Sequence, residues 1–299
     1  MAKPSRIGIV GAGTMGAGIA QIAALGGYRT AIYELDGKAL ERGMEQLRGA
    51  LRRGAERGRW KEQEAIDALE RIETDTIIEV LQDCDLVIEA APEDLDLKRN
   101  LFERLATACG PEIVLATNTS SLSVTAIAAA VPEPTRIVGM HFFNPPALMQ
   151  LVEVVAGDES GEPALELATE VARGMGRTPI RARDSVGFVA NRCVRPFFLE
   201  SLRMLGEGIA PHDEIDRIVR LGGGLVVSQP RIRSPDLTGR SGRPRSRGRL
   251  RPRASAPRRR STARRTAPRR FPPPRSRGRG RRAPRSRRPG RRTSGRRRG

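Results

Sequence analysis

Short apolar runs alternate with helical patterns along the first 183 residues of the chain. Compact, β-branched segments at 5–10, 29–34, 85–90 and 113–117 predict buried strands. Residues 14–25 and 95–108 have helical periodicity, and Asp36 can cap another helix that begins after it. Strands that alternate with helices at this spacing predict a parallel sheet covered on both faces. The expected fold class is therefore α/β, a Rossmann-type doubly wound sheet.

The pattern changes twice in the second half of the chain. Two further strands are predicted at 136–141 and 151–155, a helix at 163–175 and a last short strand at 178–181. Long amphipathic helices are then predicted at 186–205 and 213–221. The sequence thus divides into a Rossmann domain at 1–183, an incomplete helical domain at 184–226 and a tail at 227–299.

The tail accounts for the charge of the whole chain. Of the 54 basic residues, 29 are arginines in the tail, where Asp236 is the only acidic residue, so the tail carries +28. The first 226 residues hold 25 basic and 33 acidic residues and carry −8. A tail of Arg, Pro, Ser and Gly cannot bury enough apolar surface to fold, so we predict that it is disordered. Non-specific polyanion or nucleic-acid binding by the tail is one function that the charge allows.

Cysteine usage and hydropathy narrow the class of protein. Cys84, Cys109 and Cys193 form no CxxC pair and are odd in number, which disfavours a disulfide framework or a metal site and favours buried thiols in a reducing compartment. No apolar run is long enough to span a membrane, and the first strand follows Met1 almost directly, without a signal-peptide pattern. We expect a cytoplasmic protein.

A glycine-rich motif lies between the first strand and the first helix. Gly11 permits the tight turn, Gly13 lets the backbone approach a pyrophosphate, and Gly16 allows close helix–strand packing. Thr14 and Met15 fill the variable positions, and the helix N-terminus offers free N–H groups to an anion. A glycine-rich turn without a ligand is the alternative, but the strand and helix on either side favour a dinucleotide site.

An acidic residue at the end of the second strand indicates which dinucleotide binds. The carboxylate of Glu34 can accept hydrogen bonds from both ribose hydroxyls and would repel a 2′-phosphate, so NAD is favoured over NADP. Asp36 is the other candidate, but it lies past the strand and is better explained as a helix N-cap.

A histidine and a glutamate on neighbouring strands are the candidate catalytic pair. The chain has two histidines, and His212 precedes a helix where an exposed position is expected. His141 ends a strand at the edge where parallel α/β sheets bind ligands, and Glu153 lies within the next, otherwise apolar strand. If the strands pair, a carboxylate on one ring nitrogen fixes the tautomer and makes the other nitrogen a better base. Such a base could take the proton of a secondary alcohol.

Two further polar residues are candidates by position. Ser120 follows another strand of the same sheet, although a TNTSS segment alone is more typical of a turn or helix cap. Asn191 falls within the predicted helix at 186–205, where asparagine is unfavourable, so it is expected to have a partner.

Five motifs in order resemble one family. These motifs are similar to segments of the 3-hydroxyacyl-CoA dehydrogenases, including the bacterial 3-hydroxybutyryl-CoA dehydrogenases. They are GAGTMGAGIAQ, DLVIEAAPEDLDLKRNLF, LATNTSSLSVT, RIVGMHFFNPPALMQLVEVV and DSVGFVANR. The resemblance runs from about residue 5 to residue 224. It implies NAD-dependent oxidation of a (3S)-3-hydroxyacyl-CoA in fatty acid metabolism by a homodimer.

The resemblance also implies roles for individual residues. His141 would be the catalytic base and Glu153 its partner, while Ser120 and Asn191 would hold the substrate oxygens and orient His141. Further residues match positions that contact NAD in the family: Glu93, Lys98, Ser120 and Asn144. Lys98 could instead be a solvated helix charge. A basic helix segment could meet the CoA phosphates or simply face solvent: Arg52, Arg53, Arg57 and Arg59.

The sequence departs from the family after Gly224. Where the family continues with further helices, this chain continues with the arginine-rich tail, and a frameshift in a GC-rich gene is our hypothesis for the change. Two helices alone cannot form a core, so we expect a weak cleft, a lost dimer interface and low or no activity. Apolar side chains expected to lack partners are Phe188, Val194, Phe197, Phe198, Leu202 and Leu205. A different Rossmann 3-hydroxyacid dehydrogenase is a further alternative, which the His141–Glu153 pair disfavours.

Overall fold

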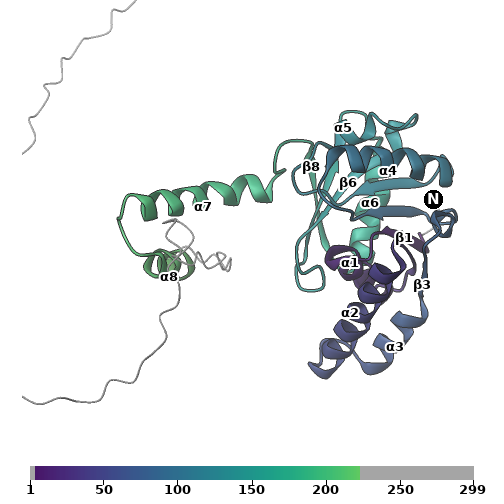
Figure 1. Cartoon of the computed structure of the whole chain (residues 1–299), viewed down its shortest axis with the longest axis horizontal. Helices are drawn as coiled ribbons and strands as arrows, with labels where there is room; N and C mark the ends of the chain where they lie inside the picture. Colours follow the sequence, from purple (N-terminus) through teal and green to yellow (C-terminus); the bar gives the residue numbers. More distant parts are fainter. Residues whose placement is uncertain (1–3, 223–299) are drawn as a thin grey trace, which may run out of the picture. The chain divides into compact units, whose positions relative to one another are not determined.

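A computed structural model of the chain describes residues 4–222, and the predicted tail lies outside them (Figure 1). Within these residues eight strands form one sheet in the order β3-β2-β1-β4-β5-β6-β7-β8. Neighbouring strands are parallel except β6 and β7, which are antiparallel. The strands are β1 (Arg6–Val10), β2 (Arg29–Tyr33), β3 (Ile72–Asp75), β4 (Leu86–Glu89), β5 (Val114–Thr117), β6 (Ile137–Phe142), β7 (Leu151–Ala156) and β8 (Thr178–Arg183).

Helices cover both faces of this sheet. The helices are α1 (Thr14–Leu25), α2 (Gly37–Glu56), α3 (Glu62–Glu70), α4 (Leu95–Ala108), α5 (Val124–Ala128), α6 (Glu162–Gly174), α7 (Ala190–Gly206) and α8 (His212–Gly222), with short 3₁₀ turns at Ile78–Leu81 and Pro134–Arg136. One core contains side chains of α1, α2, α3 and α6, and the other contains side chains of α4 and α5. Alternate residues of β4 enter opposite cores, Ile88 one and Val87 the other, as expected for a strand buried on both faces.

The predicted Rossmann-type α/β fold is confirmed. The strand order reverses between β1 and β4, and the crevice outside the carboxyl ends of these strands is where such sheets bind ligands. The proposed limits of the three parts of the chain remain predictions.

The sequence prediction was wrong at three places. The helix expected from residue 186 begins at Ala190, because Gly187 and Phe188 have positive φ angles of 74° and 46°. Strand β3 was missed because only Ile72 in IETD is apolar, and the strand lies at the edge of the sheet. Helix α5 was also missed, since five residues are too few for a helical period to show.

The burial of apolar side chains in the segment from residue 184 to residue 222 agrees only in part with the expectation that they lack partners. Phe188 was expected to lack partners but is 3% exposed and belongs to one core. Phe197 and Leu202 of α7 are exposed, as expected, and so is Leu221 of α8.

The three cysteines do not share one environment. Burial raises the pKa of Cys84 to about 12 and that of Cys109 to about 11, so both are neutral thiols. Cys193 is exposed, contrary to the expectation of three buried thiols. Across residues 4–222, no helix has the length and apolar character needed to cross a membrane.

Candidate active site

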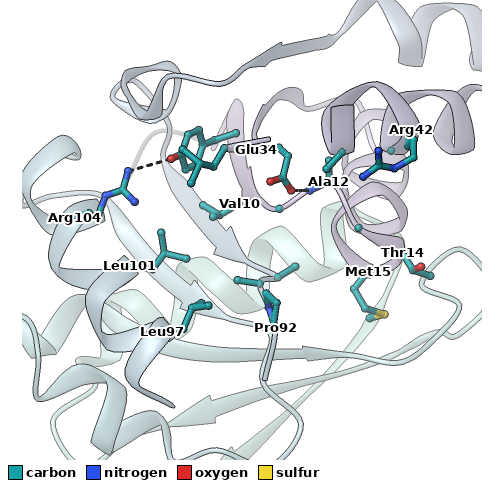
Figure 2. A pocket seen from close by; sticks show the side chains of 18 of the residues that line it. Val10, Ala12, Thr14, Met15, Glu34, Arg42, Pro92, Leu97, Leu101 and Arg104 are labelled. Carbon is teal, nitrogen blue, oxygen red and sulfur yellow. Dashed lines mark hydrogen bonds between the residues drawn. The ribbon is translucent and has the colours of Figure 1, made fainter. Parts of the chain in front are cut away.

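A cleft of about 1040 Å³ lies over the glycine-rich turn at the carboxyl ends of β1 and β4 (Figure 2). Gly11, Gly13, Thr14 and Met15 line this cleft. The N-terminus of α1 has no side-chain cap and no acidic residue in its first turn, so its N–H groups and partial positive charge remain available to an anion. The arrangement fits a dinucleotide pyrophosphate at the predicted place. Gly16 lies one turn into α1 and does not line the cleft.

Gly13 and Gly16 are expected to respond differently to alanine. A Cβ on Gly16 would overlap the carbonyl oxygen of Gly11, whereas a Cβ on Gly13 meets no protein atom within 4 Å. We expect Gly16→Ala to cost about 1–3 kcal/mol of unfolding free energy. Gly13→Ala should keep the stability but weaken NADH binding, since its Cβ enters the space of the pyrophosphate. Thermal unfolding and NADH fluorescence titration separate the two effects. Equal NADH affinity in wild type and Gly13→Ala would contradict this placement of the cofactor.

Glu34 directly follows β2, as predicted, and lines the cleft. Its Oε2 accepts a hydrogen bond from the Ala12 N–H at 3.0 Å (Figure 2). Its Oε1 accepts one from the Asp36 N–H at 3.2 Å. The carboxylate is thereby fixed between the glycine turn and α2, where it can meet a ribose. Asp36 caps α2 by accepting a hydrogen bond from the Lys38 N–H at 2.9 Å, so its interpretation as an N-cap is confirmed.

Several cleft residues were missed by sequence reasoning. Figure 2 shows Leu97, Leu101 and Arg104 of α4 on one side of the cleft and Arg42 of α2 on another. Arg104 donates a hydrogen bond to the Tyr33 hydroxyl at 3.1 Å. One available signal in the sequence was the spacing of Leu97 and Leu101, four residues apart on α4, since it places a second apolar pair beside the core residues of this helix.

The predicted pairing of His141 with Glu153 is confirmed. The two residues are direct partners in the antiparallel ladder of β6 and β7, so both side chains point to the same face. His141 Nδ1 and Glu153 Oε2 are 2.6 Å apart. His141 is 6% exposed, and the rings of Phe143 and Phe188 lie 4.4 and 5.8 Å from its own. The imidazole is therefore held by one hydrogen bond and two aromatic rings.

Glu153 also accepts hydrogen bonds from the beginning of α7. Its Oε1 accepts from the N–H groups of Val189 at 2.9 Å and Ala190 at 2.8 Å. Burial by itself raises the pKa of Glu153, but the hydrogen bonds from His141, Ala190 and Val189 outweigh it and lower the pKa overall. A buried carboxylate kept ionised in this way favours the tautomer in which Nδ1 donates the proton and Nε2 is the free acceptor.

Ser120 and Asn191 are brought together, as expected of residues in one site. The Asn191 side-chain amide donates a hydrogen bond to the Ser120 carbonyl oxygen at 3.4 Å. Asn191 is the second residue of α7, not a helix-interior residue, so the predicted conflict with helix propensity does not arise. Its predicted partner is confirmed.

Glu93 holds the turn that contains Ser120. Its Oε1 accepts hydrogen bonds from Thr119, Ser120 and Ser121, including the Ser120 N–H at 2.9 Å and hydroxyl at 3.2 Å. Partial burial raises the pKa of Glu93, but these hydrogen bonds and the charge of Lys98 outweigh it and lower the pKa. Glu93 is therefore an anion beside the candidate catalytic serine.

Lys98 is not a solvated helix charge, so that alternative is wrong. The residue is fully buried, and its Nζ lies 2.5 Å from Glu89 Oε1 and 3.8 Å from Glu93 Oε2. It also donates a hydrogen bond to the Ala91 carbonyl at 3.3 Å. Contact between Lys98 and NAD remains a prediction.

The segment that follows His141 lies against the helix of the glycine motif. A Cβ added to Gly18 of α1 would come within 2.9 Å of the Pro146 ring, so only glycine allows this close approach. Asn144 and Thr14 line the same second pocket, of about 390 Å³. The end of β6 and the N-terminal half of α1 are thus neighbours, which joins the His141 side of the site to the cofactor side.

Fold and site together define an NAD-dependent dehydrogenase of the Rossmann class. The family model for the 3-hydroxyacyl-CoA dehydrogenase NAD binding domain matches residues 6–185, and that for the family's C-terminal domain matches residues 187–231. The chain belongs to the 3-hydroxyacyl-CoA dehydrogenase family.

Individual relatives agree with this assignment. The chain is 40% identical to the 3-hydroxyadipyl-CoA dehydrogenase of Escherichia coli over 76% of its length, but it spans only 48% of that protein. It is 39% identical to a probable 3-hydroxybutyryl-CoA dehydrogenase of Deinococcus radiodurans, over 73% of this chain and 78% of the other. The crystal structure of (S)-3-hydroxybutyryl-CoA dehydrogenase from Ralstonia eutropha superimposes with a TM-score of 0.72 at 36% identity, over 75% and 79% of the two chains.

Proposed function

We propose that the chain catalyses reversible oxidation of (3S)-3-hydroxyacyl-CoA, with 3-hydroxybutyryl-CoA as the favoured substrate, to 3-ketoacyl-CoA in fatty acid metabolism. The observation that carries the proposal is the 2.6 Å contact between His141 Nδ1 and the buried, ionised Glu153. NAD, when bound, supplies the hydride acceptor. His141 Nε2 takes the hydroxyl proton, and Ser120 and Asn191 hold the substrate oxygens. The relatives that are named 3-hydroxybutyryl-CoA dehydrogenases support this substrate class.

An absorbance assay of the full chain tests this proposal. Acetoacetyl-CoA should cause oxidation of NADH, observed as loss of its absorbance. Acetoacetate, which has the same keto group without CoA, should be a much poorer substrate because the CoA contacts are missing. Faster turnover of the CoA-free compound would favour a different Rossmann 3-hydroxyacid dehydrogenase and contradict the proposal.

The second pocket is the proposed contact with CoA phosphates. Arg53, Arg57 and Arg59 line it together with Asn144, while Arg52 points elsewhere and lies 3.8 Å from Glu56. We expect Arg53→Ala and Arg57→Ala to raise the KM for acetoacetyl-CoA roughly several-fold to tenfold by loss of charge-assisted hydrogen bonds, with little change in kcat. Arg52→Ala is the matched control. An equal KM change in all three variants would indicate a general charge effect and no phosphate site.

We further propose a weakened dimer and reduced turnover, because the family's helical domain is incomplete in this sequence. Phe197, Leu199 and Leu202 are 56%, 64% and 44% exposed, and Ile218 is 63% exposed. Exposed apolar surface of this kind usually marks a face that another segment or a second copy covers. Because the sequence departs from the family after Gly224, the arginine-rich tail stands where the family's further helices would complete this region. We expect mainly monomer by sedimentation at micromolar concentration and a kcat below that of the Ralstonia eutropha enzyme in the same assay. A stable dimer with equal kcat would contradict this expectation.

A further inference from the structure

A buried ion pair at the carboxyl ends of β4 and β5 has no role in the proton transfer described above. Glu89 and Lys98 are both fully buried, and Lys98 Nζ lies 2.5 Å from Glu89 Oε1. Glu89 Oε2 accepts a hydrogen bond from the Thr117 hydroxyl at 2.7 Å, and its Oε1 accepts one from the Ala91 N–H at 2.6 Å. The carboxylate is thus attached to both strand ends.

The pair connects the cleft to the turn that carries Ser120. Lys98 Nζ reaches the Ala91 carbonyl at 3.3 Å, and Ala91 lines the cleft. On its other side, Lys98 Nζ lies 3.8 Å from Glu93 Oε2, while Glu93 Oε1 accepts the hydrogen bonds of the Ser120 turn. The Ser120 turn is also linked back to Glu89 through the chain itself. Thr117, whose hydroxyl donates to Glu89, is the last residue of β5, and the turn at 119–121 follows it directly.

Stability alone does not account for this arrangement. Removing two charges from water is costly, and apolar residues of similar volume often replace a buried ion pair without loss of stability. The pair instead lies at the crevice of the sheet, where ligands bind. Glu93 and Ser120 lie beyond the ends of β4 and β5, on the side of the glycine turn opposite to Glu34. If Glu34 binds one ribose of the dinucleotide, the nicotinamide end would lie on this side.

We propose that Glu89 and Lys98 are positioning residues whose ion pair fixes Glu93 and, through it, the Ser120 turn. Lys98 has this positioning role whether or not it also contacts the cofactor, and amide exchange of the Ser120 turn reports the positioning role by itself. The proposal rests on the proposed function only for the role of Ser120 toward substrate; the link from Glu89 to the turn is testable without turnover.

The double variant Glu89→Gln with Lys98→Met tests the proposal in the full chain. Both charges disappear together and the side chains keep similar sizes, so neither charge is left buried alone. Without Lys98, Glu93 should hold the turn less firmly. We expect the amides of Ser120 and Ser121 to exchange with deuterium roughly tenfold faster or more, with exchange in α1 unchanged. NADH affinity should fall while ADP affinity, which depends on the Glu34 side of the cleft, stays within about twofold.

Arg136→Met is the matched control. Arg136 is a cation that is 6% exposed and donates hydrogen bonds to the carbonyls of Ala106 and Ile113. It directly precedes β6 and so lies at the amino ends of the strands, away from the Glu89–Lys98 pair. Its removal should lower the thermal unfolding temperature but leave exchange of the Ser120 turn and the ratio of NADH to ADP affinity unchanged. If the double variant does not unfold cooperatively, Thr117→Val is measured in the same way. It keeps both charges, removes only the hydroxyl that donates to Glu89 Oε2, and should shift both quantities in the same direction.

Two results would overturn the proposal. The first is a double variant in which the Ser120 and Ser121 amides exchange at the wild-type rate and the ratio of NADH to ADP affinity is also that of the wild type. The other is the same pair of changes in Arg136→Met, which would indicate general destabilisation. In the acetoacetyl-CoA assay, kcat of the double variant should fall about 10- to 100-fold, more than KM changes. A wild-type chain without any turnover would refute the proposed function, while exchange and NADH binding would still decide the positioning role.

Discussion

Replacing His141 with alanine is expected to reduce kcat for acetoacetyl-CoA by about 10²- to 10⁴-fold, the usual contribution of a general acid–base group. In the reverse direction of the reaction the imidazolium gives its proton to the forming alkoxide, and alanine cannot. The proposed CoA contacts lie in the second pocket, which His141 does not line, so KM should change much less than kcat. NADH absorbance under saturating substrate measures both quantities.

The other histidine provides the control for this experiment. His212 is exposed at the beginning of α8, so His212→Ala should keep wild-type kcat. NADH affinity should stay unchanged in both variants, since neither histidine lines the cleft over the glycine turn. A His141→Ala protein that retains more than about a tenth of wild-type kcat, with normal stability, would exclude His141 as the general base.

The contact between His141 and Glu153 could be predicted because the two residues lie on strands that follow each other closely in the sequence. β6 and β7 are joined by only eight residues, so antiparallel pairing was the simplest arrangement, and a glutamate inside an apolar strand needs a buried partner. The glycine motif was predictable for a similar reason: backbone geometry after a strand leaves few residue types for the turn. In both cases a local rule determined the contact.

Contacts between distant segments could not be predicted from such rules. Lys98 lies on a helix rich in charged residues, and nothing in its periodicity distinguishes a buried lysine from a solvated one. Its partner Glu89 ends an otherwise apolar strand, which was an available signal of burial. The contact of Glu153 with α7 was also hidden, because it depends on the positive φ angle of Phe188, a conformation rare for a bulky residue.

Glu153 is expected to be almost as sensitive as His141 to a conservative change, because its two oxygens perform different tasks. Oε2 accepts from His141, and Oε1 accepts from the Val189 and Ala190 N–H groups. In Glu153→Gln, the amide oxygen must face those N–H groups, which leaves the amide NH₂ toward Nδ1. The imidazole then accepts at Nδ1 and carries its proton on Nε2, the nitrogen that should act as base. We expect kcat to fall by about 10²- to 10⁴-fold with a small change in stability.

The control for Glu153→Gln is the surface variant Glu162→Gln, which removes only an exposed ion pair with Arg181 and should keep wild-type kcat and stability.

The pH dependence of stability gives a second, independent test of Glu153. Its pKa is lowered on folding, so its charge stabilises the folded state at neutral pH, and this contribution is lost as the pH falls below the ordinary glutamate pKa and through the folded value. Glutamine has no such contribution. The difference in unfolding free energy between wild type and Glu153→Gln should therefore be largest near pH 7 and close on acidification below about pH 4. A difference that stays constant from pH 7 to pH 3, measured by denaturant unfolding, would mean that Glu153 is not held as an anion, and the tautomer argument for His141 would fail with it.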